Sequence, residues 1–121
     1  MSDAVSSDEF EVEVIGRPRQ TMRIVVRGEL DMSRTADVER AFARLDGQPV
    51  EAVVLDLRPL AFIDSSGLRC VLRVRSRVED RGLRFALVCR RNGPVHDVLR
   101  VTGLDEVLDP MFEGDQANAP G

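Results

Sequence analysis

A near-continuous apolar run, Ala52 to Leu57, most constrains the fold of this 121-residue chain. A strand with one wet face alternates apolar and polar side chains, but here Val53, Val54 and Leu55 follow one another. Such a run is typical of a central strand that is covered on both faces. We therefore place residues 52–57 in the middle of a sheet.

Two earlier segments predict a hairpin at the edge of that sheet. From Phe10 to Ile15, apolar and charged residues alternate with the period of a half-exposed strand. Residues 17–20 interrupt this pattern, and the segment from Met22 to Arg27 then continues in mostly β-branched residues. We expect these two strands to pair in an antiparallel manner.

The remaining periodicities predict helices that alternate with strands. The first expected helix follows an N-cap at Ser33 and ends near Gly47. The second runs from about Ser66 to Asp80 and is closed by Gly82. The third runs from Val95 to Val101, with Pro94 in its first turn, and ends near Gly103. The first helix has Val38, Ala41, Phe42 and Leu45 on its apolar face, and the expected later strands are Phe85–Cys89 and Val107–Leu108.

The order β-β-α-β-α-β-α-β predicts an α/β domain, with helices packed on a mixed sheet, because parallel neighbours need crossover helices. The length fits one domain, which we place at residues 9–112, between flexible tails at residues 1–8 and 113–121.

Composition narrows the partners and the compartment. No segment reaches the about 20 apolar residues of a membrane helix, and the N-terminus lacks a signal-peptide core, so we expect a cytoplasmic protein without a membrane partner. The net charge of −4 and the lack of Trp and Tyr argue against nucleic-acid binding. Cys70 and Cys89 lie in apolar runs, as reduced core cysteines do, and have no metal-ligand spacing.

The segment Asp64-Ser65-Ser66-Gly67 joins the central strand region to the start of the second predicted helix. A helix start presents free N–H groups and a positive dipole end, which stabilise a negative group by about 0.3–1 kcal/mol. A phosphate on a serine fits there, but Asp and Ser at this place are also ordinary helix caps. Local chemistry leaves both interpretations open.

Helical spacing places several arginines on the same stripe as one of the serines. At 100° per residue, this stripe contains Ser66, Arg69, Arg73 and Arg77, whereas Cys70, Val71, Val74 and Val78 face the core. A phosphate on Ser66 would add about −1.5 to −2 charges within reach of Arg69. An ordinary solvated face explains the arginines equally well.

Three motifs together resemble the bacterial anti-sigma factor antagonists of the STAS domain family. They are Gly28-Glu29-Leu30-Asp31, Phe62-Ile63-Asp64-Ser65-Ser66-Gly67-Leu68 and Thr102-Gly103-Leu104-Asp105. The resemblance covers about residues 9–112, and Asp-Ser-Ser-Gly is its most specific part.

This resemblance implies a phosphorylation switch. The unphosphorylated protein would bind an anti-sigma factor that is also a serine kinase and so release a sigma factor. The kinase would then phosphorylate Ser66, and a serine phosphatase would reset the switch. ATP and Mg would belong to the kinase, and we expect no cofactor on this chain. The expected partner-binding residues are Asp31, Asp64, Ser65, Ser66 and Gly67, to which we add Arg69 and Arg73 from the helix stripe alone.

Two other functions need separate consideration. A nucleophilic serine needs a general base, but the only histidine, His96, lies far along the chain, and no Gly-x-Ser-x-Gly motif is present, so we expect no enzyme. STAS-like domains also serve as accessory or regulatory subunits of transporters and stress-signalling complexes. Fold alone does not separate that role from the sigma pathway.

Overall fold

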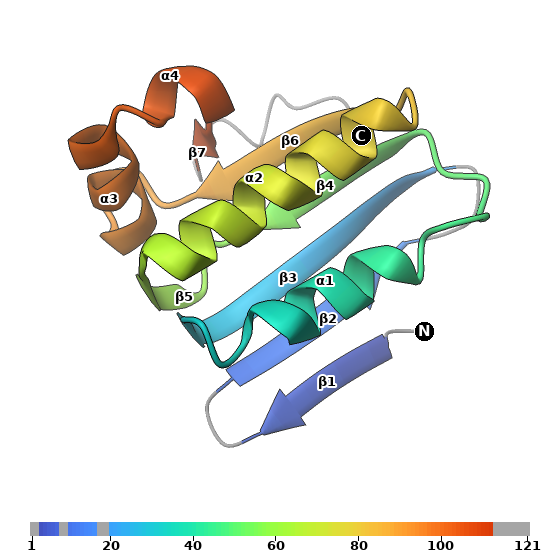
Figure 1. The fold of residues 1–121 in the computed structure, drawn as a ribbon, viewed down its shortest axis with the longest axis horizontal. Coiled ribbons are helices and arrows are strands. Elements are labelled where there is room, and N and C mark those ends of the chain that lie inside the picture. The colour runs from blue at the N-terminus through green and yellow to red at the C-terminus, as the bar shows by residue number, and fades with distance from the viewer. Residues whose placement is uncertain (1–2, 8–9, 17–19, 113–121) are drawn as a thin grey trace.

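The computed structural model describes residues 3–7, 10–16 and 20–112. In chain order, its elements are β1 (Asp3–Ser7), β2 (Phe10–Ile15), β3 (Thr21–Leu30), α1 (Thr35–Ala43), β4 (Ala52–Asp56), β5 (Leu60–Ile63), α2 (Ser65–Asp80), β6 (Arg84–Cys89), α3 (Pro94–Thr102), α4 (Asp105–Leu108) and β7 (Met111–Phe112). The strands form one mixed sheet in the order β1-β2-β3-β4-β6-β7, and β5 pairs with β3 (Figure 1). The predicted α/β class is confirmed.

Strand β3 organises the sheet because it pairs with three other strands. Antiparallel β2 lies along one edge, which confirms the predicted hairpin. On the other edge, residues 21–25 pair in parallel with β4, and residues 28–30 pair in parallel with β5. The register shifts between Gly28 and Glu29, where Gly28 has a φ of 95° that favours glycine. This irregularity lets one strand serve two partners.

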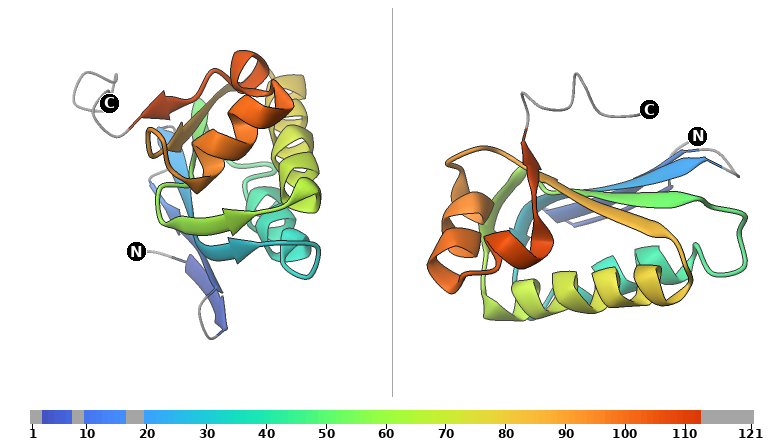
Figure 2. Two further views of the ribbon diagram at one scale, coloured as in Figure 1. Left: turned by 90° about the vertical axis from the view of Figure 1, so that its left-hand side faces the viewer. Right: turned by 90° about the horizontal axis from the view of Figure 1, so that it is seen from above.

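Helices α1 and α2 lie side by side over one face of the sheet, as the view from above shows (Figure 2). The residues that they bury against the strands include Val38, Phe42, Val71 and Val74. All eight core-facing positions predicted for these two helical segments are buried, which confirms both apolar faces.

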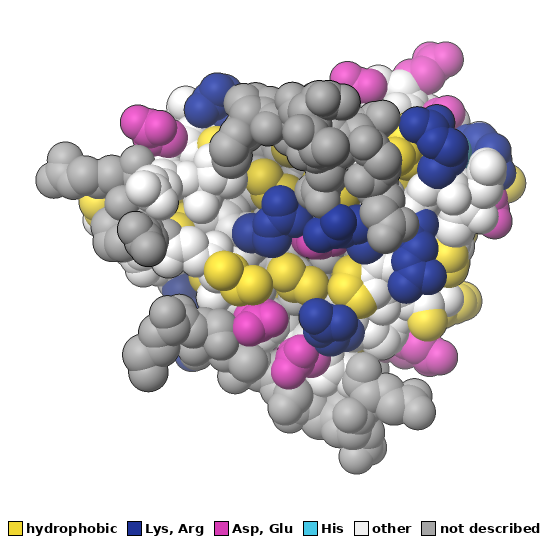
Figure 3. Space-filling view, turned by 180° about the vertical axis from the view of Figure 1, so that it is seen from behind, with side chains coloured by type: hydrophobic (Ala, Val, Ile, Leu, Met, Phe, Trp, Pro, Cys, Tyr) yellow, Lys and Arg dark blue, Asp and Glu magenta, His cyan; other side chains and the backbone are white. Residues whose placement is uncertain are grey.

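No helix in the described ranges covers the opposite face of the sheet, so the predicted covering of β4 on both faces is only partly correct. Viewed from behind, hydrophobic side chains lie between arginines and carboxylates (Figure 3). Asp56 of β4 is nevertheless 2% exposed. It forms ion pairs with Arg23 at 2.8 Å and Arg58 at 2.7 Å. The stems of such arginines can shield strand residues while their charged ends stay hydrated.

Several local predictions were wrong. Residues 3–7 form strand β1 against β2 instead of a loose tail, because backbone pairing needs no apolar pattern. Residues 105–108 form α4 instead of a strand, and the last strand is β7. Strand β5 was not predicted at all. The predicted C-terminal tail, residues 113–121, lies outside the described residues.

Candidate functional site

The Asp64-Ser65-Ser66-Gly67 segment forms the start of α2, where Asp64 is the N-cap. The Asp64 carboxylate accepts a hydrogen bond from the Gly67 backbone N–H at 2.9 Å, which satisfies one of the free donors of the first turn. Ser65 is exposed and Ser66 is half-buried. Asp64 therefore caps the helix by itself, and neither serine hydroxyl is used for that purpose in the described chain.

Gly67 fixes how closely this helix start approaches the sheet. A Cβ at Gly67 would lie 2.7 Å from the Leu30 carbonyl oxygen and 2.7 Å from Ile63 Cγ1. These distances are far shorter than van der Waals contacts, so a larger residue requires the backbone to move. Because Gly67 has no side chain, the two serines can lie close to the ends of β3 and β5.

Asp31 lies at the same end of the sheet as the two serines. The Asp64 N–H donates to the carbonyl of Leu30 at 3.3 Å, which joins the residue before Asp31 to the helix start. The Asp31 carboxylate accepts hydrogen bonds from the Ser33 hydroxyl at 2.6 Å and the Ser33 N–H at 3.0 Å. The Ser33 hydroxyl bond is the main cause that lowers the pKa of Asp31, which stays ionised.

Ser33 is therefore not the N-cap of α1, contrary to the prediction. The residue at that position is Arg34, and it makes no side-chain cap. The Ser33 hydroxyl instead donates to Asp31, two residues earlier, in the local turn that short polar side chains favour. Ser33 thus holds the Asp31 carboxylate in place at the edge of the site.

The three arginines of the predicted α2 stripe are exposed, but they have different partners. Arg69 Nη2 lies 3.3 Å from Ser66 Oγ, at the long end of hydrogen-bond distances. Arg73 instead forms an ion pair with Glu39 of α1, with Nη2 to Oε2 at 2.9 Å. The structure therefore brings Arg69 to the serine, whereas Arg73 connects the two helices.

Two exposed apolar side chains near the serines were not predicted as site residues. Met32 is 75% exposed in the turn after β3, and Phe62 is 47% exposed in β5, two residues before Asp64. Exposed large apolar groups beside a polar centre are typical of protein interfaces. Adjacent residues of a strand face opposite sides, and Ile63 faces the core. Its position next to Ile63 was therefore the sequence signal that Phe62 is exposed.

The only histidine takes part in a different set of contacts. His96 Nδ1 accepts a hydrogen bond from the Asn92 backbone N–H at 2.8 Å, and its ring centroid lies 4.6 Å from that of Phe112. Neither partner belongs to the serine segment. Burial raises the pKa of the Cys70 thiol to about 12 and that of Cys89 to about 11, which disfavours the reactive thiolate form of these two core residues.

The described residues contain no group of three or more His, Cys, Asp or Glu side chains that could hold a metal ion. Their helices are also too short or too polar to cross a membrane.

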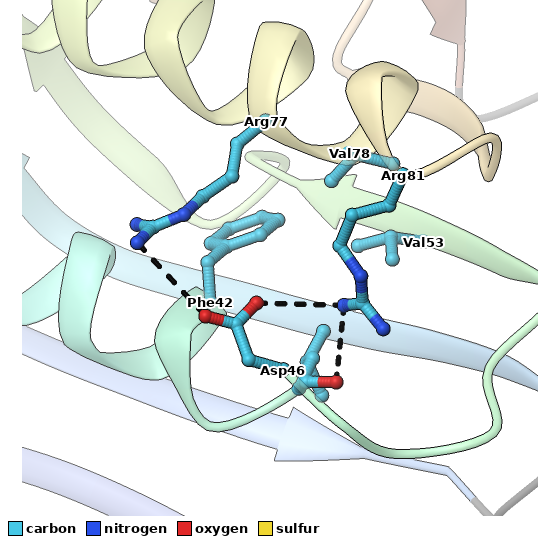
Figure 4. Close-up of a pocket in the computed structure, with 7 residues that line it drawn as sticks. Phe42, Asp46, Val53, Arg77, Val78 and Arg81 are labelled. Atoms are coloured by element: carbon cyan, nitrogen blue, oxygen red, sulfur yellow. Dashed lines mark hydrogen bonds and ion pairs between the residues drawn. The ribbon is translucent and has the colours of Figure 1, made fainter.

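A cleft of about 220 Å³ lies between the C-terminal ends of α1 and α2, where Arg77 and Arg81 approach Asp46 (Figure 4). Much of this volume is open solvent, so the cleft is a shallow surface feature and not an enclosed ligand site.

A family comparison agrees with the arrangement of these motifs. The family model of the STAS domain matches residues 9–116, which is most of the chain. The chain belongs to the STAS domain family. An anti-sigma F factor antagonist from Paenibacillus polymyxa is 32% identical to this STAS domain over 99 residues, which are 80% of this chain and 82% of that protein.

Solved structures share the fold of this STAS domain. An anti-sigma factor antagonist from Mycobacterium paratuberculosis has a TM-score of 0.72 at 24% identity, with 89% of each chain covered. The anti-sigma factor antagonist SpoIIAA in its unphosphorylated form has a TM-score of 0.68 at 22% identity over 91% of this chain and 98% of its own. A sulfate transporter family protein from Wolinella succinogenes, at 16% identity, reaches 0.63 over 78% and 75%. At these identities the structures show the fold alone.

Proposed function

We propose that this STAS domain is an anti-sigma factor antagonist that acts by binding, without catalysis of its own. Its partner is an anti-sigma factor with serine kinase activity, and binding releases the sigma factor which that partner holds. The main support is a helix start whose cap is supplied by Asp64, so that the Ser66 hydroxyl stays available beside an exposed arginine. The 32% identical antagonist supports the same pathway.

The proposed binding surface contains the helix start and its surroundings. It combines the carboxylates of Asp31 and Asp64, the two serines, and the exposed side chains of Met32 and Phe62. Apolar groups at the centre of an interface contribute most of the affinity, and the surrounding polar groups give register and specificity. Gly67 allows the helix start to lie close to the ends of β3 and β5.

Phosphorylation of Ser66 is the proposed off switch. The kinase transfers the γ-phosphoryl group of ATP to Ser66 Oγ, a base of the kinase takes the hydroxyl proton, and ADP leaves. The product carries about −1.5 to −2 added charges at neutral pH. That charge lies on the same surface as the ionised Asp31 carboxylate and must be desolvated in the complex. Each loss of about 1.4 kcal/mol weakens binding tenfold.

A serine phosphatase reverses this modification and restores binding. The test is incubation of the protein with candidate anti-sigma kinases and ATP, followed by mass spectrometric mapping of the phosphate. We expect phosphate on Ser66 and none on Ser66→Ala, with Ser65→Ala as the matched control that is still modified. Efficient modification of Ser66→Ala at Ser65 would overturn the residue assignment.

Capture experiments separate this role from that of a transporter subunit. We expect the unphosphorylated protein to retain an ATP-binding kinase from a cell extract. Retention of a membrane permease instead would favour the role of a transporter accessory subunit. A sulfate transporter family protein shares this fold.

A further inference from the structure

The arginines of α2 differ in whether a carboxylate already binds them. Arg73 is paired with Glu39 of α1, and Arg75 lies 3.6 Å from Glu79 on its own helix. Arg77 approaches Asp46 at 4.0 Å. In the part of the chain that the structure describes, Arg69 contacts no carboxylate, and its one polar side-chain contact is with Ser66 Oγ.

The position of Arg69 relative to Ser66 suits an anion on the serine oxygen. Residues three apart lie on the same face of a helix, and Arg69 Nη2 is already within 3.3 Å of Ser66 Oγ. A neutral hydroxyl offers the guanidinium only a weak hydrogen bond at this distance. A phosphate offers three anionic oxygens that extend outward from Oγ, and guanidinium groups bind phosphate through short, charge-assisted and often paired hydrogen bonds.

We propose that Arg69 is a phosphate-binding residue that holds phosphorylated Ser66 within the same chain. The inference rests on the proposed function only in taking Ser66 as the modified residue. Phosphorylation then has two effects on the surface offered to a partner. It adds negative charge, and it also engages the one α2 arginine that has no carboxylate partner among the described residues.

The ionisation of the phosphate itself provides the test. Phosphoserine is placed at position 66 during synthesis of the full chain, so that no kinase is needed, and its second pKa, normally about 6, is followed by ³¹P NMR. A bound guanidinium favours the dianion, so Arg69→Gln should raise this pKa by about half a unit, as expected for an exposed ion pair. Arg69→Lys keeps the charge but not the paired geometry and should give an intermediate value.

Arg73→Gln is the matched control because it removes the same charge from the same stripe, one turn further along. We expect it to change the phosphate pKa by less than half as much, since Arg73 is held by Glu39. Arg69 side-chain N–H signals should also move downfield on phosphorylation. Equal pKa values in the Arg69→Gln and unsubstituted proteins, or equal effects of the two substitutions, would overturn the proposal.

The result does not depend on the kinase pathway. If no anti-sigma kinase modifies Ser66, the proposed function fails while the difference between the Arg69 and Arg73 variants remains. If Ser66 is the kinase target but Arg69→Gln leaves its pKa unchanged, the switch stands and the role of Arg69 is wrong.

Discussion

Replacement of Asp56 by Asn tests how the helix-free face of the sheet is stabilised. Asp56 is the only buried carboxylate in the described ranges. One of its oxygens accepts from Arg23 at 2.8 Å and from Arg58 Nη2 at 2.7 Å, and the other accepts from the N–H and Nε of Arg58, both at 3.0 Å. Asn keeps one oxygen acceptor but loses the charge and half of this acceptor set.

The magnitude follows from these contacts and from the exposure of the two arginines. Hydrogen bonds to a charged group contribute about 1.5–3 kcal/mol, and removal of one partner from a fully buried pair costs about 3–5 kcal/mol. The side chains of Arg23 and Arg58 are 33% and 29% exposed, so water can replace part of the hydrogen bonding to Asp56 that the two arginines lose. We expect Asp56→Asn to lower the free energy of unfolding at pH 7 by about 2 kcal/mol and Tm by about 8 °C.

The effect should depend on pH in a definite direction. Burial raises the pKa of Asp56, but the hydrogen bonds and charge of Arg58, together with Arg23, outweigh it and hold this pKa below its usual value. A lowered folded-state pKa gives stability that is present above the unfolded-state pKa and is lost as the pH falls through the folded-state value. The difference between the two proteins should therefore shrink below about pH 4.

Urea denaturation at pH 7 and pH 3 measures both quantities. Glu79→Gln is the control because it removes a carboxylate from an exposed ion pair with Arg75, and its expected effect is below about 0.5 kcal/mol. A loss at pH 7 as small as that of the control, or a larger loss at pH 3 than at pH 7, would refute the reasoning.

Three further predictions concern packing, helix contacts and the thiols. Gly67→Ala should lower the free energy of unfolding by about 1–3 kcal/mol in urea titrations, despite the better helix propensity of Ala, because its Cβ would meet the Leu30 carbonyl; a gain in stability would contradict this. Asp46→Asn should cost less than about 1 kcal/mol by the same method, since its ion pairs are exposed; a loss above 2 kcal/mol would assign it a larger role. Cys70 and Cys89, with pKa values raised to about 12 and about 11, should not react with a thiol reagent at pH 8 until the protein unfolds; rapid labelling of the folded protein would show that burial does not protect them.

Long periodic segments made much of the fold predictable from sequence. The continuous apolar run indicated the central strand β4, and the apolar positions that recur at helical spacing indicated the buried face of α2. Strand β5 escaped prediction because four residues after Pro59 are too few for a period, and its partner is the far end of β3. Strand β1 is held through backbone pairing with β2, which leaves little trace in side-chain type.

The candidate site was predictable where its residues are neighbours along one helix. Arg69 and Ser66 are three residues apart, so helical spacing alone placed them together. The pairing of Arg73 with Glu39 depends on how α1 packs beside α2, and the exposure of Met32 depends on the turn after β3. Such features require tertiary structure. Phosphorylation of Ser66 stays a prediction.

The affinity of the anti-sigma kinase for the two forms of this STAS domain tests the central claim most directly. Isothermal titration calorimetry would compare the unmodified protein with a chain that carries phosphoserine at position 66. We predict that the unmodified protein binds and that the phosphorylated protein binds at least tenfold more weakly, a loss of about 1.4 kcal/mol or more. Equal affinity of the two forms would contradict the account.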